Sequence, residues 1–348
     1  MTDDPLTERE HVILEAVIRT YVETAEPAGS RTVARRFRLG ISPATVRNTM
    51  SDLEEKGYLF HPHTSAGRVP TDLAYRLYVD SLMQRPSLSP AERTQLRREL
   101  ETRGEGAAIE TLLRRAAQVL GLLTQELGIA AAPRLDAATL ERIDLIAVAE
   151  GKVLLVMQLR AAGLRTIYVD VPAALPPSTL ASVARVLNER LAGLALKEIR
   201  ATLSARLRDT QAGGEPGASE LLNVFVQGAD ELFHSPPESE LHLGRASVLA
   251  EQPEFASGER LKNLIELTER RELLSRVMES RAGEGGLKVT IGVEHGDPAL
   301  ADFTVVTSEY RSAGLKGVIG VIGPTRMPYD RVIAMVESTS TLISDFLA

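Results

Sequence analysis

The chain has 348 residues and a net charge of −7, and its 44% hydrophobic and 25% charged residues are typical of a globular protein. This length predicts two or three domains with enough apolar residues to form sizeable cores. The absence of Cys excludes a disulfide scaffold, a Cys-ligated zinc or iron–sulfur site and a thiol nucleophile.

Targeting and membrane segments are not expected. The first residues, MTDDP, are acidic and lack the apolar run of a signal peptide. The longest apolar stretches are far shorter than the ~20 residues that cross a bilayer. Aromatic residues make up 4% of the chain and Trp is absent, which disfavours single-strand binding on stacked rings. We therefore expect a cytoplasmic protein with no membrane partner.

The first 57 residues predict three helices. A helix over residues 6–24 begins at Thr7 and Glu10, whose spacing is that of a capping box. A second helix begins at Ser30, which can cap it. The Leu-Gly pair at residues 39–40 then predicts a tight turn, because Gly tolerates a positive φ.

The third helix has clear start and stop signals. Ser42 can cap its free N–H groups, Pro43 fits the first helical position, and Gly57 follows the last turn. The expected inward positions are Val46, Met50 and Leu53. The outward side carries short side chains and one guanidinium, which suit base edges and phosphates. These outward residues are Ala44, Thr45, Arg47, Asn48 and Ser51.

Local charge favours a surface that faces phosphates. Residues 27–51 contain five Arg and no Asp or Glu, although the whole chain has 47 acidic and 40 basic residues. A basic block within an acidic protein indicates contact with nucleic acid. The alternative is a solvated helical hairpin in which the charges cluster by chance. The capped helix and the Gly turn favour DNA binding over that alternative.

A small two-stranded wing is expected after the third helix. Residues 58–61 favour a strand, residues 62–67 a loop, and residues 68–69 a returning strand. The wing tip would lie against the sugar–phosphate backbone or the minor groove. Its expected contact residues are His63, Thr64, Ser65 and Arg68. His61 and His63 could also be metal ligands, but no third ligand is nearby, so no metal site is predicted.

The rest of the chain predicts an α+β multidomain fold. Helices are expected over residues 71–83, within 90–127, and over 179–191, 197–209, 219–234, 258–280 and 329–346. Strands are expected over residues 143–149, 153–159, 164–171, 288–294, 303–310 and 317–322, with a further one within 242–250. Because strands precede and follow a helical block, we expect one sheet interrupted by an inserted helical subdomain.

No enzymatic constellation is found. The glycines at 317, 320 and 323 could belong to an anion-binding loop, with Arg326 beside it, but the intervening Val and Ile favour a buried strand. His234, His242 and His295 each lack a nearby acid or serine pattern. The sequence therefore predicts no enzyme, no cofactor and no metal.

Several strings resemble the HrcA family of heat-inducible transcription repressors. They are EPAGSRT (26–32), SPATVRN (42–48), DLEE (52–55), PHTSAGRVPTD (62–72), YRLYVD (75–80) and GVIGPTRMPY (320–329). Because they lie in order at both ends, the resemblance covers essentially the whole chain. One departure is Thr49, where the family is expected to carry an acidic residue more often.

The resemblance implies a winged-helix domain over residues 1–85 and a GAF-like domain in two parts, 90–175 and 283–348. A dimerisation subdomain inserted at 176–282 would separate those parts. It also implies a homodimer that represses chaperone operons by binding an inverted-repeat operator of the CIRCE type on double-stranded DNA. The GroEL chaperonin would modulate it, and heat stress would relieve repression. Bound protein would be associated with the nucleoid.

The predicted DNA-binding residues follow from the helix, the charge block and the wing. They are Arg31, Arg35, Ser42, Ala44, Thr45, Arg47, Asn48, His63, Thr64, Ser65 and Arg68. Two alternatives remain open: a winged-helix regulator of another regulon that senses a small ligand near Arg326, and an enzyme with a DNA-binding appendage. The missing catalytic constellation makes the second the weaker.

Overall fold

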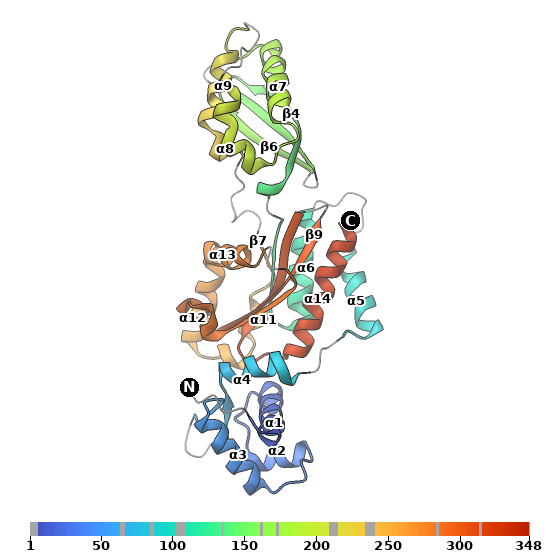
Figure 1. Cartoon of the computed structure of the whole chain (residues 1–348), viewed down its shortest axis with the longest axis vertical. Coiled ribbons are helices and arrows are strands. Elements are labelled where there is room, and N and C mark those ends of the chain that lie inside the picture. The colour runs from blue at the N-terminus through green and yellow to red at the C-terminus, as the bar shows by residue number, and fades with distance from the viewer. Residues whose placement is uncertain are drawn as a thin grey trace. The chain divides into compact units, whose positions relative to one another are not determined.

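The computed structural model separates into two compact units. It describes residues 6–62, 67–83, 87–101, 109–133, 135–160, 163–171, 174–208, 215–233, 241–282, 285–312 and 315–347. The main unit comprises Met1–Ala131, Leu241–Glu309 and Val318–Ile343. The inserted unit comprises Ala132–Glu240, Tyr310–Gly317 and Ser344–Ala348. Figure 1 labels the elements of both units.

The main unit begins with an N-terminal segment, residues 6–83, of three helices, two short strands and a fourth helix (Figure 1). These are α1 (Glu8–Thr24), α2 (Ser30–Arg36), α3 (Pro43–Glu55), β1 (Leu59–Phe60), β2 (Val69–Pro70) and α4 (Asp72–Leu77), which continues as a π-helical turn, Tyr78–Leu82. The predicted capping box forms, since Thr7 and Glu10 exchange hydrogen bonds at the start of α1. Ile13, Val33 and Val46 are fully buried between the first three helices.

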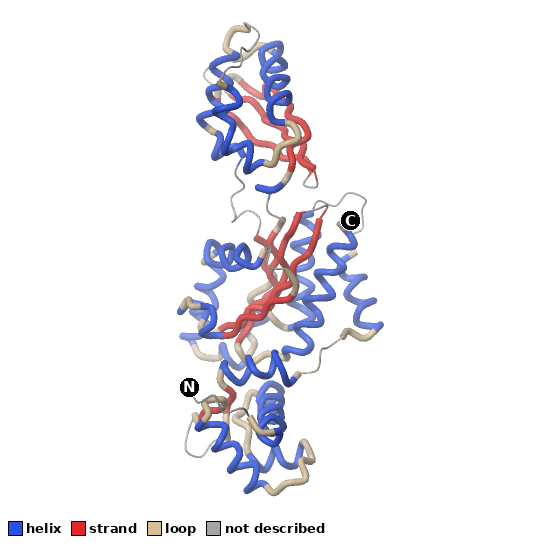
Figure 2. Tube along the Cα trace, viewed as in Figure 1, coloured by secondary structure: helices blue, strands red, loops and turns tan. Residues whose placement is uncertain are grey.

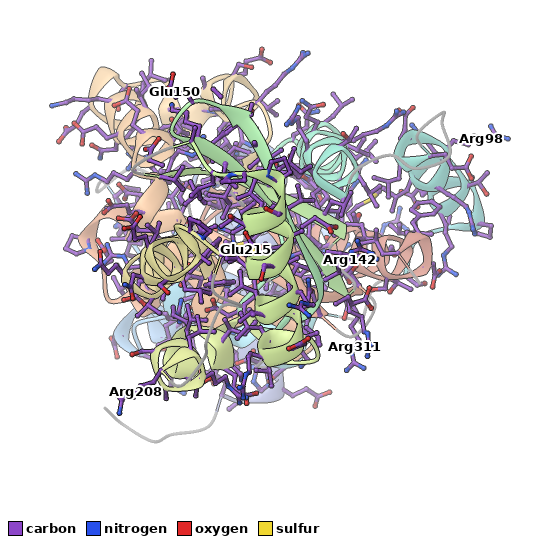
Figure 3. The ribbon with its side chains drawn as sticks, turned by 90° about the horizontal axis from the view of Figure 1, so that it is seen from above. Arg98, Arg142, Glu150, Arg208, Glu215 and Arg311 are labelled. Carbon is purple, nitrogen blue, oxygen red and sulfur yellow. The ribbon has the colours of Figure 1, made fainter. Side chains whose placement is uncertain are left out.

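The rest of the main unit, which we call the main body, is a five-stranded sheet with helices on both faces (Figure 2). The strand order is β7-β3-β10-β9-β8, and the strands are β7 (Leu241–Leu243), β3 (Leu127–Ala131), β10 (Leu315–Pro324), β9 (Phe303–Ser312) and β8 (Leu287–Ile291). The helices are α5 (Pro90–Leu100), α6 (Ile109–Thr124), α11 (Ser247–Ala250), α12 (Gly258–Glu269), α13 (Arg271–Arg281) and α14 (Tyr329–Phe346). Leu264 and Met278 of α12 and α13 pack against Ile129 and Phe303 of the sheet. Arg98 of α5 is exposed and points away from the ribbon (Figure 3).

The inserted unit is a three-stranded antiparallel sheet with helices on one face. Its strands are β4 (Thr139–Ala149), β5 (Lys152–Arg160) and β6 (Gly163–Asp170), and its helices are α7 (Pro177–Leu191), α8 (Leu196–Leu207), α9 (Ala218–Gln227) and α10 (Ala229–Phe233). Leu155 and Met157 point towards the helices and are fully buried. The other face of the sheet leaves Ile146, Leu164 and Tyr168 50%, 72% and 67% exposed.

The sheet organisation differs from the sequence expectation. Strands near 143–171 and 288–322 were expected to form one sheet, yet in the described part of the chain β4, β5 and β6 form a separate three-stranded sheet. Short turns join these three strands, so they close a meander locally. The main sheet instead uses β3, which directly follows the expected helical stretch 90–127 and was not expected as a strand. The compact insertion therefore runs from Ala132 to Glu240, and α12 and α13 belong to the main unit rather than to a subdomain over 176–282.

The glycine run near the C-terminus is a strand, as expected. Residues 317–323 lie inside β10, and these residues are all buried. A Cβ on Gly323 would lie 2.0 Å from the Glu126 carboxylate, so this glycine permits close packing. Burial raises the pKa of Glu126 well above its usual range, which favours a neutral carboxyl group at this contact.

His295 predicts a pH dependence of stability. It ends the short turn Gly292–His295, and burial, with the nearby positive Arg281, lowers its pKa from 6.5 to about 4. Between these values the unfolded chain binds a proton that the folded chain does not, so stability should fall as the pH decreases from about 6.5 towards 4. Urea denaturation of wild type and His295→Gln across this range measures the effect. The variant should lose part of the slope, and an unchanged slope would assign the dependence to other groups.

Candidate nucleic-acid interface

Helix α3 starts and ends where its sequence signals indicate. The Ser42 hydroxyl accepts a hydrogen bond from the Thr45 N–H at 3.1 Å, and Pro43 occupies the first turn. Val46 and Leu53 are fully buried, so the inward face is confirmed. This orientation leaves the opposite side of α3 exposed to solvent.

The predicted base-reading residues come together on that exposed side. Ser42, Ala44, Arg47 and Asn48 are exposed, and Thr45 is half-buried with its hydroxyl 2.9 Å from that of Ser42. The first turn of α3 contains no acidic residue. The N-terminal part of this face thus combines a guanidinium, an amide and two hydroxyls, which are groups that can contact base edges.

Thr49 lies on the other side of the helix. Its side chain is buried, and its hydroxyl donates a hydrogen bond to the Thr45 carbonyl at 3.2 Å. The residue at which an acidic side chain was expected therefore packs inward. It changes no side chain on the exposed face.

The arginines of α2 extend the basic surface. Arg31 and Arg35 are exposed, and within the described residues neither forms an ion pair. Arg36 is instead paired with Glu23, and both Arg36 and Arg19 lie over the Phe37 ring, with guanidinium carbons 5.9 and 5.6 Å from its centroid. Arg31 and Arg35 are thus the side chains of α2 that remain available to phosphates.

The strand pair is tied to the helices through Arg68. This Arg forms an ion pair with Glu54 of α3 at 2.7 Å, and its backbone exchanges hydrogen bonds of 2.8 and 3.0 Å with Ala28. Its side chain is 17% exposed. The predicted phosphate contact of Arg68 stays a prediction, whereas its structural role is evident. His63, Thr64 and Ser65 lie outside the described residues.

Gly67 explains why one position in the family-like stretch 62–72 requires glycine. A Cβ at this position would lie 2.4 Å from the backbone carbon and oxygen of Ala28. No real Cβ tolerates such a distance, so any other residue would push the second strand away from the start of α2. The glycine is needed for close approach of two backbones.

Arg326, considered as an anion ligand, is already engaged. Its guanidinium pairs with both carboxylate oxygens of Glu254 and donates a hydrogen bond of 2.6 Å to the Val22 carbonyl of α1. The hydrogen bond to Glu254 raises the pKa of Arg326. A cavity of about 340 Å³ lies beside it, lined among others by Tyr21, Tyr75 and Phe255.

Sequence reasoning missed these partners. Glu54 and Glu254 were not singled out, because an ion pair between residues far apart in sequence leaves no local pattern. The described residues contain no group of three or more His, Asp or Glu that could hold a metal. In the same part of the chain, no helix is long and apolar enough to cross a membrane.

Comparisons with known proteins identify the family of the chain. A family model described as the HrcA protein C-terminal domain matches residues 110–333. A heat-inducible transcription repressor HrcA from Chlorobium phaeobacteroides (strain BS1) is 36% identical, with 99% of each chain covered. One from Roseiflexus castenholzii is 35% identical, covering all of this chain and 96% of the relative. A crystal structure described as a hypothetical protein has a TM-score of 0.62 at 23% identity over 99% of both chains, which supports the fold. The chain belongs to the HrcA family of heat-inducible transcription repressors.

Proposed function

We propose that this protein represses chaperone operons by binding an inverted-repeat operator of the CIRCE type as a homodimer. The observation that carries the proposal is the exposed face of α3, on which Arg47 and Asn48 are free of acidic neighbours in the first turn. In this proposal the N-terminal segment is a winged helix-turn-helix. Helix α3 enters the major groove, and α2 and the wing contact the backbone.

The remaining parts of the proposal concern assembly and control. The main body would be the GAF-like domain, and the inserted unit would provide dimerisation. A two-fold dimer matches a palindromic operator, because each protomer reads one half-site. From family resemblance, the GroEL chaperonin would modulate repression, which heat stress would relieve. The protein would work in the cytoplasm and associate with the nucleoid when bound.

The open sheet face of the inserted unit supports a homodimer. Ile146, Leu154 and Tyr168 lie side by side on three neighbouring strands, and Val156 and Leu164 extend the same face. Apolar side chains that remain exposed on an ordered sheet indicate an interaction surface. A second copy would bury this face.

Operator binding tests the proposal directly. Footprinting of purified protein on the regions upstream of the chaperone operons should protect an inverted repeat. Affinity for that repeat should exceed affinity for a scrambled duplex by about 10³-fold or more, with a steep salt dependence. Equal affinity for both duplexes would contradict a sequence-specific repressor.

A second candidate, a small-ligand sensor, rests on the cavity beside Arg326. Its volume of about 340 Å³ falls within the range of small-molecule sites. The pairing of Arg326 with Glu254 and Val22 weakens the earlier idea that this Arg holds an anion. Native mass spectrometry of freshly purified protein should show a retained small molecule if the cavity is a sensor site, and an empty protein would count against it.

A further inference from the structure

Two arginines attach the N-terminal segment to the main body, and we call each of them, with its partners, a clamp. The first clamp is formed by Arg326 of the main body, which contacts Glu254 and the Val22 carbonyl. Arg326 follows β10, and Glu254 lies in the short turn before α12. Both side chains are only 14% exposed. The guanidinium is held by Glu254, and its remaining nitrogen donates to the Val22 carbonyl in α1. The planar guanidinium of Arg326 thus links the Glu254 carboxylate of the main body to the backbone of α1, the helix that packs against α3.

A second clamp starts in the N-terminal segment. Arg76 of α4 donates to both oxygens of Glu294 at 2.8 and 2.6 Å, and to the Val289 carbonyl of β8 at 2.7 Å. Asp72, at the start of α4, accepts a hydrogen bond from the Val293 N–H at 3.1 Å. Burial works to raise the pKa of Glu294, but the hydrogen bonds from Arg76 and the Ile291 N–H, together with the positive charge of Arg76, lower it overall, so this carboxylate is ionised at neutral pH.

Packing between the segment and the body is incomplete beside the clamps. Tyr75 of α4 contacts Tyr329 of α14, with ring centroids 5.6 Å apart. The cavity of about 340 Å³ separates Tyr21 of α1 from Phe255 and Phe303 of the body. Since apolar contact is interrupted there, we expect the directional hydrogen bonds of the two arginines to contribute strongly to the orientation of the segment.

We propose that Arg326 and Arg76, with Glu254 and Glu294, are positioning residues for operator binding. They hold the N-terminal segment in one orientation on its own main body, which narrows the range of separations at which a dimer presents its two α3 helices. The inference rests on the proposed function, because it concerns an inverted repeat read by a dimer. None of the four side chains needs to contact DNA for this effect.

Fixed presentation has a measurable consequence. Once the α3 helix of one protomer occupies its half-site, the α3 helix of the second protomer is held near the other half-site. Its effective concentration there depends on how narrowly the position of this second helix is restricted. Weakening the clamps lets the second α3 helix occupy a wider range of positions, which lowers affinity for the full repeat. Affinity for a single half-site does not depend on the second helix and should stay unchanged.

The test uses the full-length variants Glu254→Gln, Glu294→Gln and the double variant, with Arg326→Lys as a conservative change that keeps charge and loses the fork. Affinity is measured for the full repeat, for one half-site, and for repeats whose spacer is lengthened or shortened. The double variant should lose about tenfold or more on the natural repeat, stay within about twofold on the half-site, and depend less on spacer length. Arg326→Lys should be intermediate.

The matched control is Glu266→Gln, which removes pairs with Lys262 and Arg270 along α12 without changing either clamp. Thermal melting and sedimentation establish whether each variant is folded and dimeric. If the double variant is not, the same affinities are compared for the single variants. Wild-type affinity and spacer dependence in the variants would overturn the inference, as would a parallel loss on the half-site. A wild-type protein with no preference for the inverted repeat would instead contradict the proposed function.

Discussion

Replacing Arg47 by Ala should weaken binding to the operator by about 1–3 kcal/mol, or roughly 5- to 150-fold. Arg47 is exposed on the first turns of α3, and no acidic residue of the first turn competes for its guanidinium. A bidentate contact with a guanine would be lost entirely, because Ala has no donor. Fluorescence anisotropy on operator and scrambled duplexes at one fixed salt concentration measures the change.

The comparison between the two duplexes decides the role of Arg47. A loss confined to the operator assigns a base contact, whereas an equal loss on both assigns a phosphate contact. Arg98→Ala on α5 is a suitable control, because it removes the same charge from an exposed helix of the main body. Unchanged affinity of Arg47→Ala on both duplexes would place α3 outside the interface.

Replacing Tyr168 by Glu should convert the proposed dimer into monomers. Tyr168 lies on the open sheet face in the edge strand β6, opposite Leu154 on the central strand β5, and is 67% exposed. Burying an unpaired carboxylate in an interface costs several kcal/mol. Affinity for the full repeat should fall by roughly 100-fold or more, because each half-site would then be bound independently. Sedimentation equilibrium and anisotropy measure the two effects.

A matched substitution controls for charge. Ala181→Glu adds the same charge at an exposed position of α7, on the helical side of the same unit, and should leave both dimer and affinity unchanged. A Tyr168→Glu protein that stays dimeric would exclude this face as the interface. If both variants dissociate, the effect would reflect total charge rather than the sheet face.

Local signals in the sequence predicted the third helix and its exposed face. The hydroxyl cap of Ser42, the proline after it and the glycine at 57 act within a few residues, so they operate before any tertiary contact forms. The three- and four-residue spacing of Val46, Met50 and Leu53 then determined which side is buried. The glycine run in β10 was predicted for a similar reason, since its intervening residues favour a buried strand.

Sheet membership and long-range pairs could not be predicted in this way. Strand propensity does not tell which other strand will be the partner, so β4–β6 were assigned to the wrong sheet. The short strand β3 follows a long helical pattern and was missed. The pairs Arg68–Glu54, Arg76–Glu294 and Arg326–Glu254 each join distant residues. Gly67 was recognised only as loop chemistry, because its close contact with Ala28 depends on the folded backbone.

The pairing of β3 with β7 bears on how the two units fold and evolve. Ala131, the last residue before the insertion, lies directly opposite Leu241, the first residue after it. In the main sheet, β3 and β7 are therefore paired like the two strands of a hairpin, and the inserted unit takes the place of the hairpin turn. The entropy of closing such a loop grows only with the logarithm of its length. A chain with a tight turn in place of the inserted unit should therefore keep the register between β3 and β7, and the inserted unit can be exchanged without redesign of the main sheet.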